Sequence, residues 1–452
     1  MVVVTQKEEN IHMPRLQRLL PLALLCACLA SAQDNVRTVT ILHSNDIHAR
    51  LSPLENGNGG FAYLATVIRR ERENCTGCLL LNAGDVVQGS PVSTIFKGLP
   101  VFEIANLFGF DAGTLGNHDF DYGWEQTRKF MEVANYPIAT SNIVDGEGRL
   151  FTRQPYIVLL TNGVRVAVVG AMTDTLDTLT KPQARGPWHT TSLMEAVRRY
   201  ANEARGRADL TVVLAHITDN EEEALLALGP LVPVIVSGHE HQGLPEARVK
   251  DGRMVVRAKA DGEELGRLEL RVDMEHKSVA SWSWKKVGVD SKSLTPAPDV
   301  AGQVKRWEDQ VSHVVDQPLA VAEREFSRAE VKLLIERAMR DQTGSDFAFM
   351  NAGGVRDILP KGQLLVRHVW NLMPFDNEVV VGKFKGRDLP AVVTAGQTIE
   401  PDREYTLAVS DFTAANQSAP SQLHTSGLVF APSGPPMRDM IVDWVRRQGV
   451  LK

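Results

Sequence analysis

The chain has 452 residues, of which 43% are hydrophobic and 23% are charged, and its formal net charge is −6 at pH 7. These values are typical of a soluble globular protein with two or three domains. A negative net charge without a cluster of Lys and Arg argues against binding to a nucleic-acid polymer.

The N-terminal segment predicts export. Positively charged residues precede an apolar run at residues 19–30, and an Ala-Ser-Ala sequence ends at Ala32, as in a secretory signal peptide. A run of about twelve residues is too short for a membrane span, which needs roughly 20. We therefore expect cleavage after Ala32 and a periplasmic or secreted protein without a stable membrane span. A weak lipoprotein pattern at residues 25–28 leaves anchoring through Cys28 as an alternative.

Two cysteines, Cys75 and Cys78, remain after this cleavage, in the sequence Cys-Thr-Gly-Cys. In an oxidising compartment a local disulfide is the favoured interpretation. A single pair with this spacing is weak evidence for a zinc or redox site.

Apolar strand-like runs alternate with helical patterns along much of the chain. We expect strands at residues 36–42, 79–81, 164–169, 210–214, 232–236 and 264–270, and helices at 61–72, 100–108, 193–205 and 221–226. This alternation predicts an α/β fold with much parallel pairing, because strands buried on both faces read as continuous apolar runs. Such sheets bind ligands beyond the carboxyl ends of their strands.

Polar clusters follow several of these runs. They are residues 43–48 (HSNDIH), 82–85 (NAGD), 116–119 (GNHD), His216, and 238–241 (GHEH). Two divalent ions about 3.5–4 Å apart need a bridging carboxylate together with neutral imidazole and amide ligands. Asp85 is the natural bridge. The mixture of imidazole, carboxylate and amide groups suits zinc, manganese, cobalt or iron, and does not choose among them.

These clusters, in this order, look like the five-block signature of the calcineurin-like metallophosphoesterases. The strings SNDIHARL, LLLNAGDVVQGSP and LGNHDFDYG resemble the secreted 5′-nucleotidase / UDP-sugar hydrolase family, and the similarity covers nearly all of the mature chain. The resemblance implies an α/β protein with a four-layer α/β/β/α metallophosphoesterase domain. A smaller, shortened α/β C-terminal domain would follow.

The resemblance also implies roles for the polar residues. One metal ion would bind Asp46, His48, Asp85 and His241, and the other would bind Asp85, Asn117, His216 and His239. A hydroxide that bridges the two ions would attack phosphorus. His118 is similar to the family's catalytic histidine, and Asp121 would orient its ring.

The domain limits follow from composition. We expect a signal peptide at residues 1–32, a metallophosphoesterase domain at 33–290, a linker with a long helix at 291–318, and a substrate-binding domain at 319–452. The linker is predicted from its Pro and Ser enrichment and from the polar helical pattern at 300–315.

The last domain resembles the family's substrate domain. Its Asn-x-Gly-Gly-x-Arg element would bind the nucleotide, and two phenylalanines would hold the base, through Asn351, Gly353, Gly354, Arg356, Phe375 and Phe412. An arginine can grip a phosphate with two hydrogen bonds. Base stacking on an aromatic face contributes roughly 1–3 kcal/mol.

This domain also departs from the family pattern. Residues 414–419 read Ala-Ala-Asn-Gln-Ser-Ala where the family has a Gly-Gly-Asp-Gly element that contacts ribose, and the segment between Thr394 and Tyr405 is short. Three nearby arginines lie in no matching motif: Arg324, Arg328 and Arg337. Hydrolysis is therefore better supported than a preference for nucleotides.

Three functions compete. The favoured one is a 5′-nucleotidase, a nucleotide-binding hydrolase of nucleotide catabolism that acts on nucleoside 5′-monophosphates and also on UDP-sugars. The second is a 2′,3′-cyclic-nucleotide phosphodiesterase, or another phosphate- or sulfur-ester hydrolase, on the same scaffold. The third, a non-catalytic binding protein, would be expected to lack a metal ligand or His118, and the chain lacks none of them. The sequence predicts neither the metal nor the oligomeric state.

Overall fold

The computed structural model describes residues 35–419 and 422–452. The predicted signal peptide and Cys28 lie outside these residues. Within them, no helix is both long enough and apolar enough to cross a membrane.

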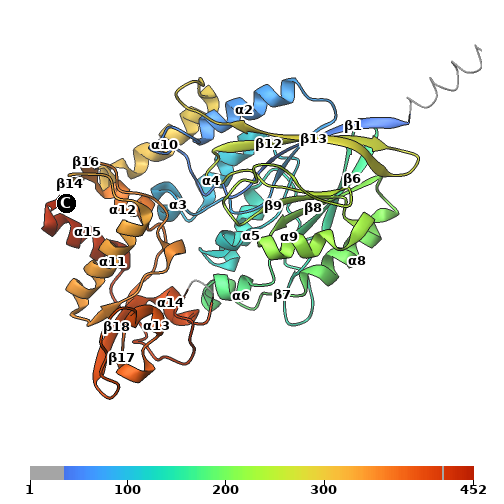
Figure 1. Cartoon of the computed structure of the whole chain (residues 1–452). Helices are drawn as coiled ribbons and strands as arrows, with labels where there is room; N and C mark the ends of the chain where they lie inside the picture. The colour runs from blue at the N-terminus through green and yellow to red at the C-terminus, as the bar shows by residue number, and fades with distance from the viewer. Residues whose placement is uncertain (1–34, 420–421) are drawn as a thin grey trace, which may run out of the picture.

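Two β-sheets form the centre of the first domain (Figure 1). The first has the strand order β13 (Ser278–Gly288), β12 (Glu264–Asp273), β1 (Val36–Ser44), β2 (Cys78–Asn82), β3 (Ala112–Gly113). The second has the order β10 (Arg248–Lys250), β11 (Arg253–Val256), β9 (Val234–Gly238), β8 (Leu210–His216), β6 (Val164–Met172), β5 (Tyr156–Thr161).

The two sheets pack face to face through a core of aliphatic side chains. Ile41 of β1 and Leu214 of β8 belong to this core, whereas Leu42 faces a second core under the helices. Because β8 is buried on both faces, its sequence (LTVVLAH) is a mostly apolar run instead of an alternating one.

Helices cover the outer faces of both sheets. The first sheet lies under α2 (Phe61–Glu73), α4 (Leu99–Ala105) and α5 (Trp124–Val133), and the second under α8 (Leu193–Arg205) and α9 (Asp219–Leu226). In α8 the buried residues Leu193, Val197, Ala201 and Ala204 recur at helical spacing. The four-layer α/β/β/α prediction is confirmed.

The pairing is less parallel than the alternation suggests. β12 pairs with β1 and β13 in antiparallel fashion, and β5 pairs with β6 in the same way. Strands β5 and β13 were not predicted, because both lie at sheet edges and expose much of their length. The disulfide between Cys75 and Cys78, with Cα atoms 5.5 Å apart, agrees with the favoured interpretation.

The second domain is a smaller α/β unit with two three-stranded sheets. Their orders are β16 (Gly362–Leu365), β14 (Pro318–Ala322), β19 (Val450–Leu451) and β15 (Phe347–Ala348), β18 (Glu404–Ser410), β17 (Val379–Lys385). Its core is built with α11 (Arg328–Thr343), α12 (Val366–Leu372) and α15 (Met437–Gln448). Between β17 and β18 lie two short helical segments, at Gly386–Asp388 and Ala391–Thr394 (α13), and connecting loops.

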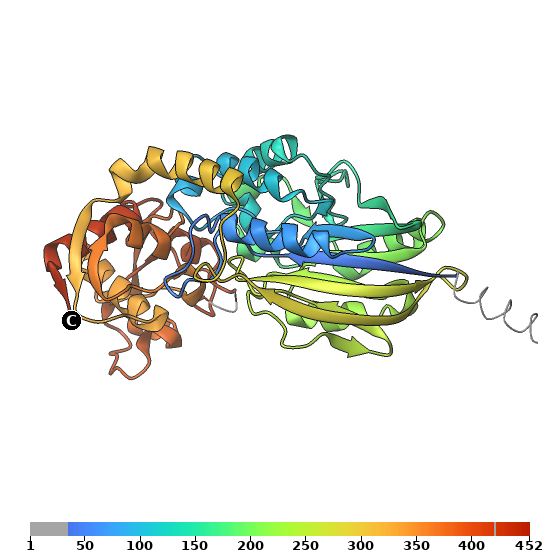
Figure 2. The ribbon, with the colours of Figure 1, turned by 90° about the horizontal axis from the view of Figure 1, so that it is seen from above.

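Helix α10 (Pro298–Val315) connects the domains, and Figure 2 shows it running from the first domain to the second. Its Val300, Val311 and Val315 are buried in the core of the first domain. Its Glu308 accepts a hydrogen bond from Arg367 of α12, at 2.6 Å. Because α10 packs on both domains, the limits at residues 290 and 318 stay a prediction.

Candidate active site

The polar clusters lie in loops at the carboxyl ends of strands from both sheets. Asp46 and His48 follow β1, Asp85 follows β2, Asn117 follows β3, His216 ends β8, and His239 and His241 follow β9. The register places the end of β1 beside the end of β2, and the end of β8 beside that of β9. The loops therefore meet at one edge, as expected for parallel strands.

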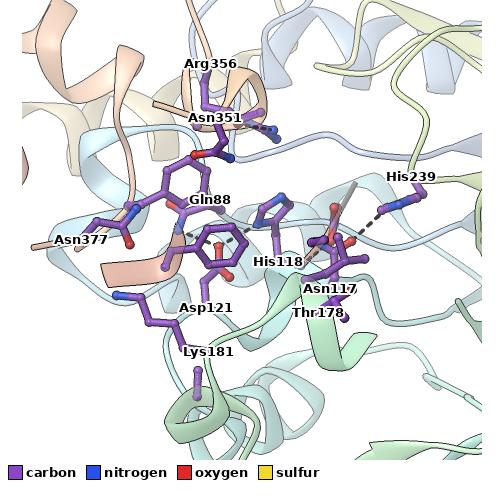
Figure 3. A pocket seen from close by; sticks show the side chains of 18 of the residues that line it. Gln88, Asn117, His118, Asp121, Thr178, Lys181, His239, Asn351, Arg356 and Asn377 are labelled. Carbon is purple, nitrogen blue, oxygen red and sulfur yellow. Dashed lines mark hydrogen bonds and ion pairs between the residues drawn. The ribbon is translucent and has the colours of Figure 1, made fainter. Parts of the chain in front are cut away.

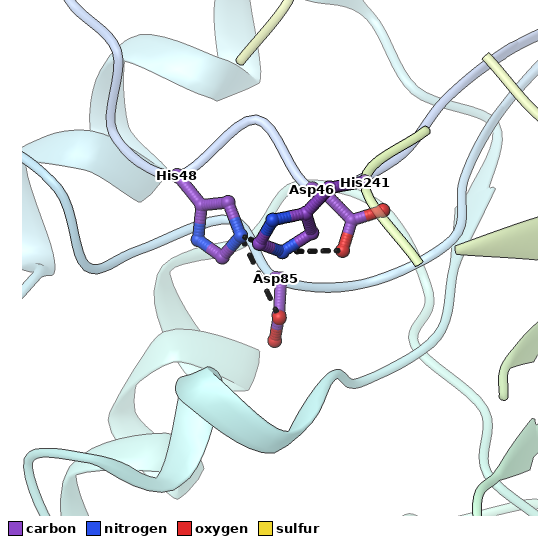
Figure 4. Close-up of side chains that lie close together, drawn as sticks. All are labelled: Asp46, His48, Asp85 and His241. Carbon is purple, nitrogen blue, oxygen red and sulfur yellow. Dashed lines mark hydrogen bonds and ion pairs between the residues drawn. The ribbon is translucent and has the colours of Figure 1, made fainter. Parts of the chain in front are cut away.

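The first group of side chains comprises Asp46, His48, Asp85 and His241 (Figure 4). One ligand atom from each lies within 4.8 Å of all the others. The Nε2 atoms of His48 and His241 are 3.0 Å apart. Asp46 and Asp85 are fully buried.

The second group shares Asp85 with the first. His216 Nε2 lies 3.1 Å from Asp85 Oδ2 and 3.2 Å from Asn117 Oδ1. His239 Nδ1 lies 3.0 Å from the same Asn117 oxygen. All seven residues expected to bind metal are thus brought together, in two groups of four with one carboxylate in common.

Neighbouring backbone and amide groups orient these side chains. The Nδ1 of His216 donates to Ala83 O at 2.8 Å, which turns Nε2 toward the group. Asn45 Nδ2 donates to Asp46 Oδ2 at 2.7 Å. Such contacts fix the tautomer and ring orientation of ligating histidines.

Asp119 clamps two of the ligand loops together. Its carboxylate accepts hydrogen bonds from the backbone N–H groups of Asp85, Val86 and Gly116, at 2.9 to 3.2 Å. A Cβ atom at Gly116 would overlap the carboxylate of Asp85, so the close approach of the loops requires glycine there. The sequence placed Asp119 in a motif without revealing this role.

Five of the predicted ligands have a left-handed backbone. The φ angles are 50° at Asp46, 44° at His48, 53° at Asp85, 89° at His239 and 56° at His241. Non-glycine residues adopt this region uncommonly, and such strain clusters at functional sites. The loops therefore hold these side chains at a cost in backbone free energy.

The donor set fits divalent metal ions. It contains two carboxylates, four imidazoles and one amide, and no thiolate. Burial raises the pKa of Asp46 to about 6, and burial lowers the pKa of His239 to about 3. Asp85 Oδ2 is buried and accepts no hydrogen bond among the described residues, although His216 Nε2 is near. A cation would neutralise these clustered carboxylates.

His118 stands apart from the ligand groups and contacts Asp121. Its Nδ1 lies 2.7 Å from Asp121 Oδ2. Burial lowers the pKa of His118, but the carboxylates of Asp121 and Asp85 outweigh that effect and leave the pKa above its usual value. The imidazolium form is thereby favoured.

A cavity of about 550 Å³ opens above both residues, between the domains (Figure 3). This volume suits a small organic ligand. One wall carries His118 and four of the predicted metal ligands, namely Asp85, Asn117, His239 and His241. The other carries all six residues predicted to bind substrate: Asn351, Gly353, Gly354, Arg356, Phe375 and Phe412.

Arg356 reaches across the domain boundary. Its Nη2 lies 3.1 Å from His48 Nε2, and its guanidinium carbon lies 5.8 Å from the centre of the Phe375 ring. The Phe375 ring centre lies 5.6 Å from that of His118. Arg50, which the sequence did not single out, pairs with Asp357 at 3.0 Å and so fixes the residue next to Arg356.

The segment that follows Phe412 borders the cavity. Residues 411–415 form the short helix α14 (Asp411–Ala415), and Ser418 is exposed and does not line the cavity. Of the residues after it, Ala419 and Gln422 do line the cavity. None of the three arginines at positions 324, 328 and 337 lies in the lining.

The fold and the two linked ligand groups define a metallophosphoesterase. Residues 39–243 match the calcineurin-like phosphoesterase family, and residues 302–395 match the 5′-nucleotidase C-terminal domain. Residues 39–243 therefore form a calcineurin-like phosphoesterase domain, and residues 302–395 belong to a 5′-nucleotidase C-terminal domain.

Two relatives match most of this chain at low identity. Protein UshA of Escherichia coli is 26% identical, over 86% of this chain and 83% of its own. Endonuclease YhcR of Bacillus subtilis is 26% identical over 84% of this chain, which spans only 37% of that longer protein.

Two solved structures from Thermus thermophilus have the same fold. The 5′-nucleotidase precursor superposes with a TM-score of 0.81 at 22% identity, covering 92% of this chain and 97% of the other. The sulfate thiohydrolase SoxB gives 0.79 at 18% identity, covering 91% and 94%. This chain is thus about equally similar in fold to two enzymes with different names. Similarity of fold alone therefore does not indicate which substrate this chain takes.

Proposed function

We propose that the protein is a two-metal phosphoester hydrolase that acts as a 5′-nucleotidase, with nucleoside 5′-monophosphates as its main substrates and UDP-sugars as further ones. The observation that carries this proposal is the pair of ligand groups sharing Asp85 on one wall of a cavity. The facing wall offers a cation and two aromatic rings, as a phosphate with an attached base requires.

Each metal ion would have four protein ligands. Asp46, His48, Asp85 and His241 would hold one ion, and Asp85, Asn117, His216 and His239 the other. When bound, the two ions would activate water and withdraw charge from the phosphoryl group. Zinc, manganese, cobalt and iron all suit this donor set.

His118 would serve as the general acid. Its Nδ1–H donates to Asp121, which leaves Nε2 to face the substrate. The imidazolium can pass its Nε2 proton to the 5′-oxygen as the bond from that oxygen to phosphorus breaks, so that the nucleoside leaves as an alcohol. Asp121 stabilises the positive charge until the transfer.

The second domain would hold the rest of the substrate. The Arg356 guanidinium, close to His48, can donate two parallel hydrogen bonds to the phosphate. Phe375 and Phe412 both line the cavity and can stack on the base, with Asn351 and the backbone at Gly353 and Gly354 beside them.

A substrate panel tests the proposal. The mature protein, loaded with Mn²⁺, Zn²⁺ or Co²⁺, should release phosphate from AMP, with UDP-glucose, 2′,3′-cyclic AMP and bis(p-nitrophenyl) phosphate compared by kcat/KM. His118→Ala provides the inactive control. If the loaded wild type turns over none of these compounds, the proposal is wrong.

A second candidate keeps the chemistry and changes the substrate. In the segment after Phe412, Ser418 is exposed, whereas Gln422 lines the cavity and is 2% exposed. A changed wall at this place favours 2′,3′-cyclic nucleotides or a sulfur ester. A kcat/KM for 2′,3′-cyclic AMP or an organic thiosulfate above that for AMP would select this candidate.

We also propose export with cleavage after Ala32. The Cys75–Cys78 disulfide supports it, since such bonds persist in oxidising compartments. N-terminal sequencing of the exported protein should begin at Gln33. A lipid-modified N-terminal Cys28 would instead support anchoring.

A further inference from the structure

A buried amide stands behind the carboxylate of Asp121. Gln88 lies three residues after Asp85 and is 2% exposed. Its Nε2 donates to Asp121 Oδ2 at 2.9 Å, and the same oxygen lies 2.7 Å from His118 Nδ1 (Figure 3). One carboxylate oxygen therefore accepts hydrogen bonds from two sides, the imidazole and the amide.

Tyr122 and Ser93 fix the orientation of that amide. Tyr122 donates its hydroxyl proton to Gln88 Oε1 at 3.3 Å, and the Tyr122 oxygen lies 3.0 Å from Ser93 Oγ. The backbone N–H of Gln88 donates to Ser93 Oγ at 3.1 Å. If the amide were turned over, its oxygen would face the carboxylate of Asp121. The observed orientation is the one that satisfies every partner.

The backbone of Gln88 is strained. Its φ is 73°, in the left-handed region, where a glycine would fit at a lower cost in free energy. Strained residues persist where their surroundings hold them, and they cluster at catalytic sites. Here the surroundings hold both ends of the residue, because the backbone bonds to Ser93 and the side chain bonds to Asp121 and Tyr122.

We propose that Gln88 is a positioning residue for the reaction: it holds the Asp121 carboxylate against His118 Nδ1, so that His118 Nε2 points at the leaving oxygen. Tyr122 and Ser93 would support it by keeping the amide N–H directed at Asp121. The inference rests on the proposed function for the role of His118. The hydrogen-bonded chain itself is independent of the substrate's identity.

Three variants probe this role. Gln88→Met keeps the length of the side chain and removes the donor, so kcat for AMP should fall about 10- to 100-fold, as for the loss of other outer contacts that orient reactive groups. KM should stay within about two-fold, because Gln88 acts through Asp121. Gln88→Glu places a second carboxylate beside Asp121 and should lower kcat at least as much. Tyr122→Phe should lower it less.

Gln126→Met is the matched control. Gln126 also donates its amide N–H, to Lys97 O at 2.7 Å, but it is only partly buried and does not line the cavity. This variant should keep the wild-type kcat.

A double-mutant cycle separates positioning from general damage. In an Asp121→Asn background, Gln88→Met should cost little further kcat, because the group through which it acts is already altered. Full additivity of the two losses, or an unchanged kcat in Gln88→Met, would overturn the proposal.

A spectroscopic readout does not depend on turnover. In protein labelled with ¹⁵N-histidine, the Nδ1–H resonance of His118, assigned by its loss in His118→Ala, should shift in Gln88→Met and in Tyr122→Phe but not in Gln126→Met. An unmoved resonance in the first two variants contradicts the inference. If the wild type hydrolyses none of the phosphate esters, the proposed function fails, and this shift still decides whether Gln88 holds the pair. Tyr122→Phe, which keeps the aromatic ring, supplies the result if Gln88→Met does not fold.

Discussion

The two walls of the cavity are built in different ways. On the first wall the predicted metal ligands are mostly buried, follow strands, and are cross-linked by backbone hydrogen bonds. On the second wall the residues lie in loops and short helical segments. Ion pairs of neighbouring residues join this wall to the first domain, and besides the largely buried pair Arg50–Asp357 they are exposed to solvent. One pair, Lys181–Asp411, has both side chains 28% exposed, and another, Lys97–Asp376, is about half exposed. Exposed pairs contribute little free energy.

This difference separates chemistry from recognition. The first domain brings the reactive groups together within its own fold. Binding of the substrate, in contrast, depends on the position of the second domain relative to the first. Removing a group from the first wall should therefore lower turnover, and removing one from the second should mainly weaken binding. Four predictions test this contrast.

The largest effect should come from removing the metal ions. Dialysis against a chelator should lower kcat for AMP by roughly 10³-fold or more, since metal ions stabilise the transition state by several kcal/mol. Added Mn²⁺, Zn²⁺ or Co²⁺ should restore it in the wild type but not in Asp85→Ala, which lacks the shared carboxylate. Full activity with no metal detected by mass spectrometry would contradict the two-metal proposal.

His118→Ala should have the next largest effect. Loss of a general acid costs about 10²- to 10⁴-fold in rate. Because His118 belongs to neither ligand group, the metal content of the variant, measured by mass spectrometry, should equal that of the wild type. A variant that loses its metal would show that His118 acts as a ligand.

On the second wall, Phe412→Ala should raise KM for AMP. Loss of a base-stacking contact worth about 1–3 kcal/mol corresponds to a rise in KM of roughly 5- to 150-fold. Ribose 5-phosphate, which has no base, should be turned over by wild type and variant alike. Phe430→Leu is a fitting control, since Phe430 packs on Phe384 away from the cavity. A kcat loss with unchanged KM would place Phe412 with the reactive groups.

The smallest effect should come from removing an ion pair in the sheet behind the first wall. The pair joins Arg165 of β6 to Asp209. Hydrogen bonds from Arg165 hold the pKa of Asp209 well below its usual value. A depressed pKa means that this pair stabilises the fold above the unfolded pKa of about 3.9, and that the stabilisation is lost as pH falls toward the folded pKa.

Asp209→Asn should therefore lower the melting temperature at pH 7 by roughly 2 °C, a small shift because Arg165 is half exposed. The difference between variant and wild type should shrink in melts recorded at pH 4 and pH 3. At pH 7, kcat should not change. If the difference in melting temperature between variant and wild type grew as the pH fell, the Asp209 carboxylate would not stabilise the fold in the way proposed.

The sequence predicts those elements whose pattern is decided by burial. Helix α8 was expected at 193–205 and spans Leu193–Arg205, because its apolar residues face one sheet. The buried strands β1 and β8 were found, with ends two residues further on. Strand β3 has only two residues, so the position of Asn117 came from a motif and not from any strand pattern.

Contacts between segments that are far apart in the chain could not be predicted from the local sequence. Arg50 and Asp357 are 307 residues apart, and nothing in the sequence around either residue reveals that they pair. The hydrogen bonds of Gln88 likewise depend on Asp121 and Tyr122, more than thirty positions away. The sequence shows which residue types follow a strand. Their hydrogen-bond partners, which orient the side chains, come from distant segments and are known only from the complete fold.

The left-handed backbone at five predicted ligands also bears on the folding equilibrium. Without cations, strained loops bring two buried carboxylates together, which favours the unfolded chain. An ion that binds only the folded state shifts the equilibrium back, by about 2.7 kcal/mol at a concentration 100 times its Kd. Metal supply would thus govern how much enzyme is folded as well as how fast it works, and metal-poor surroundings would expose these loops to proteases first.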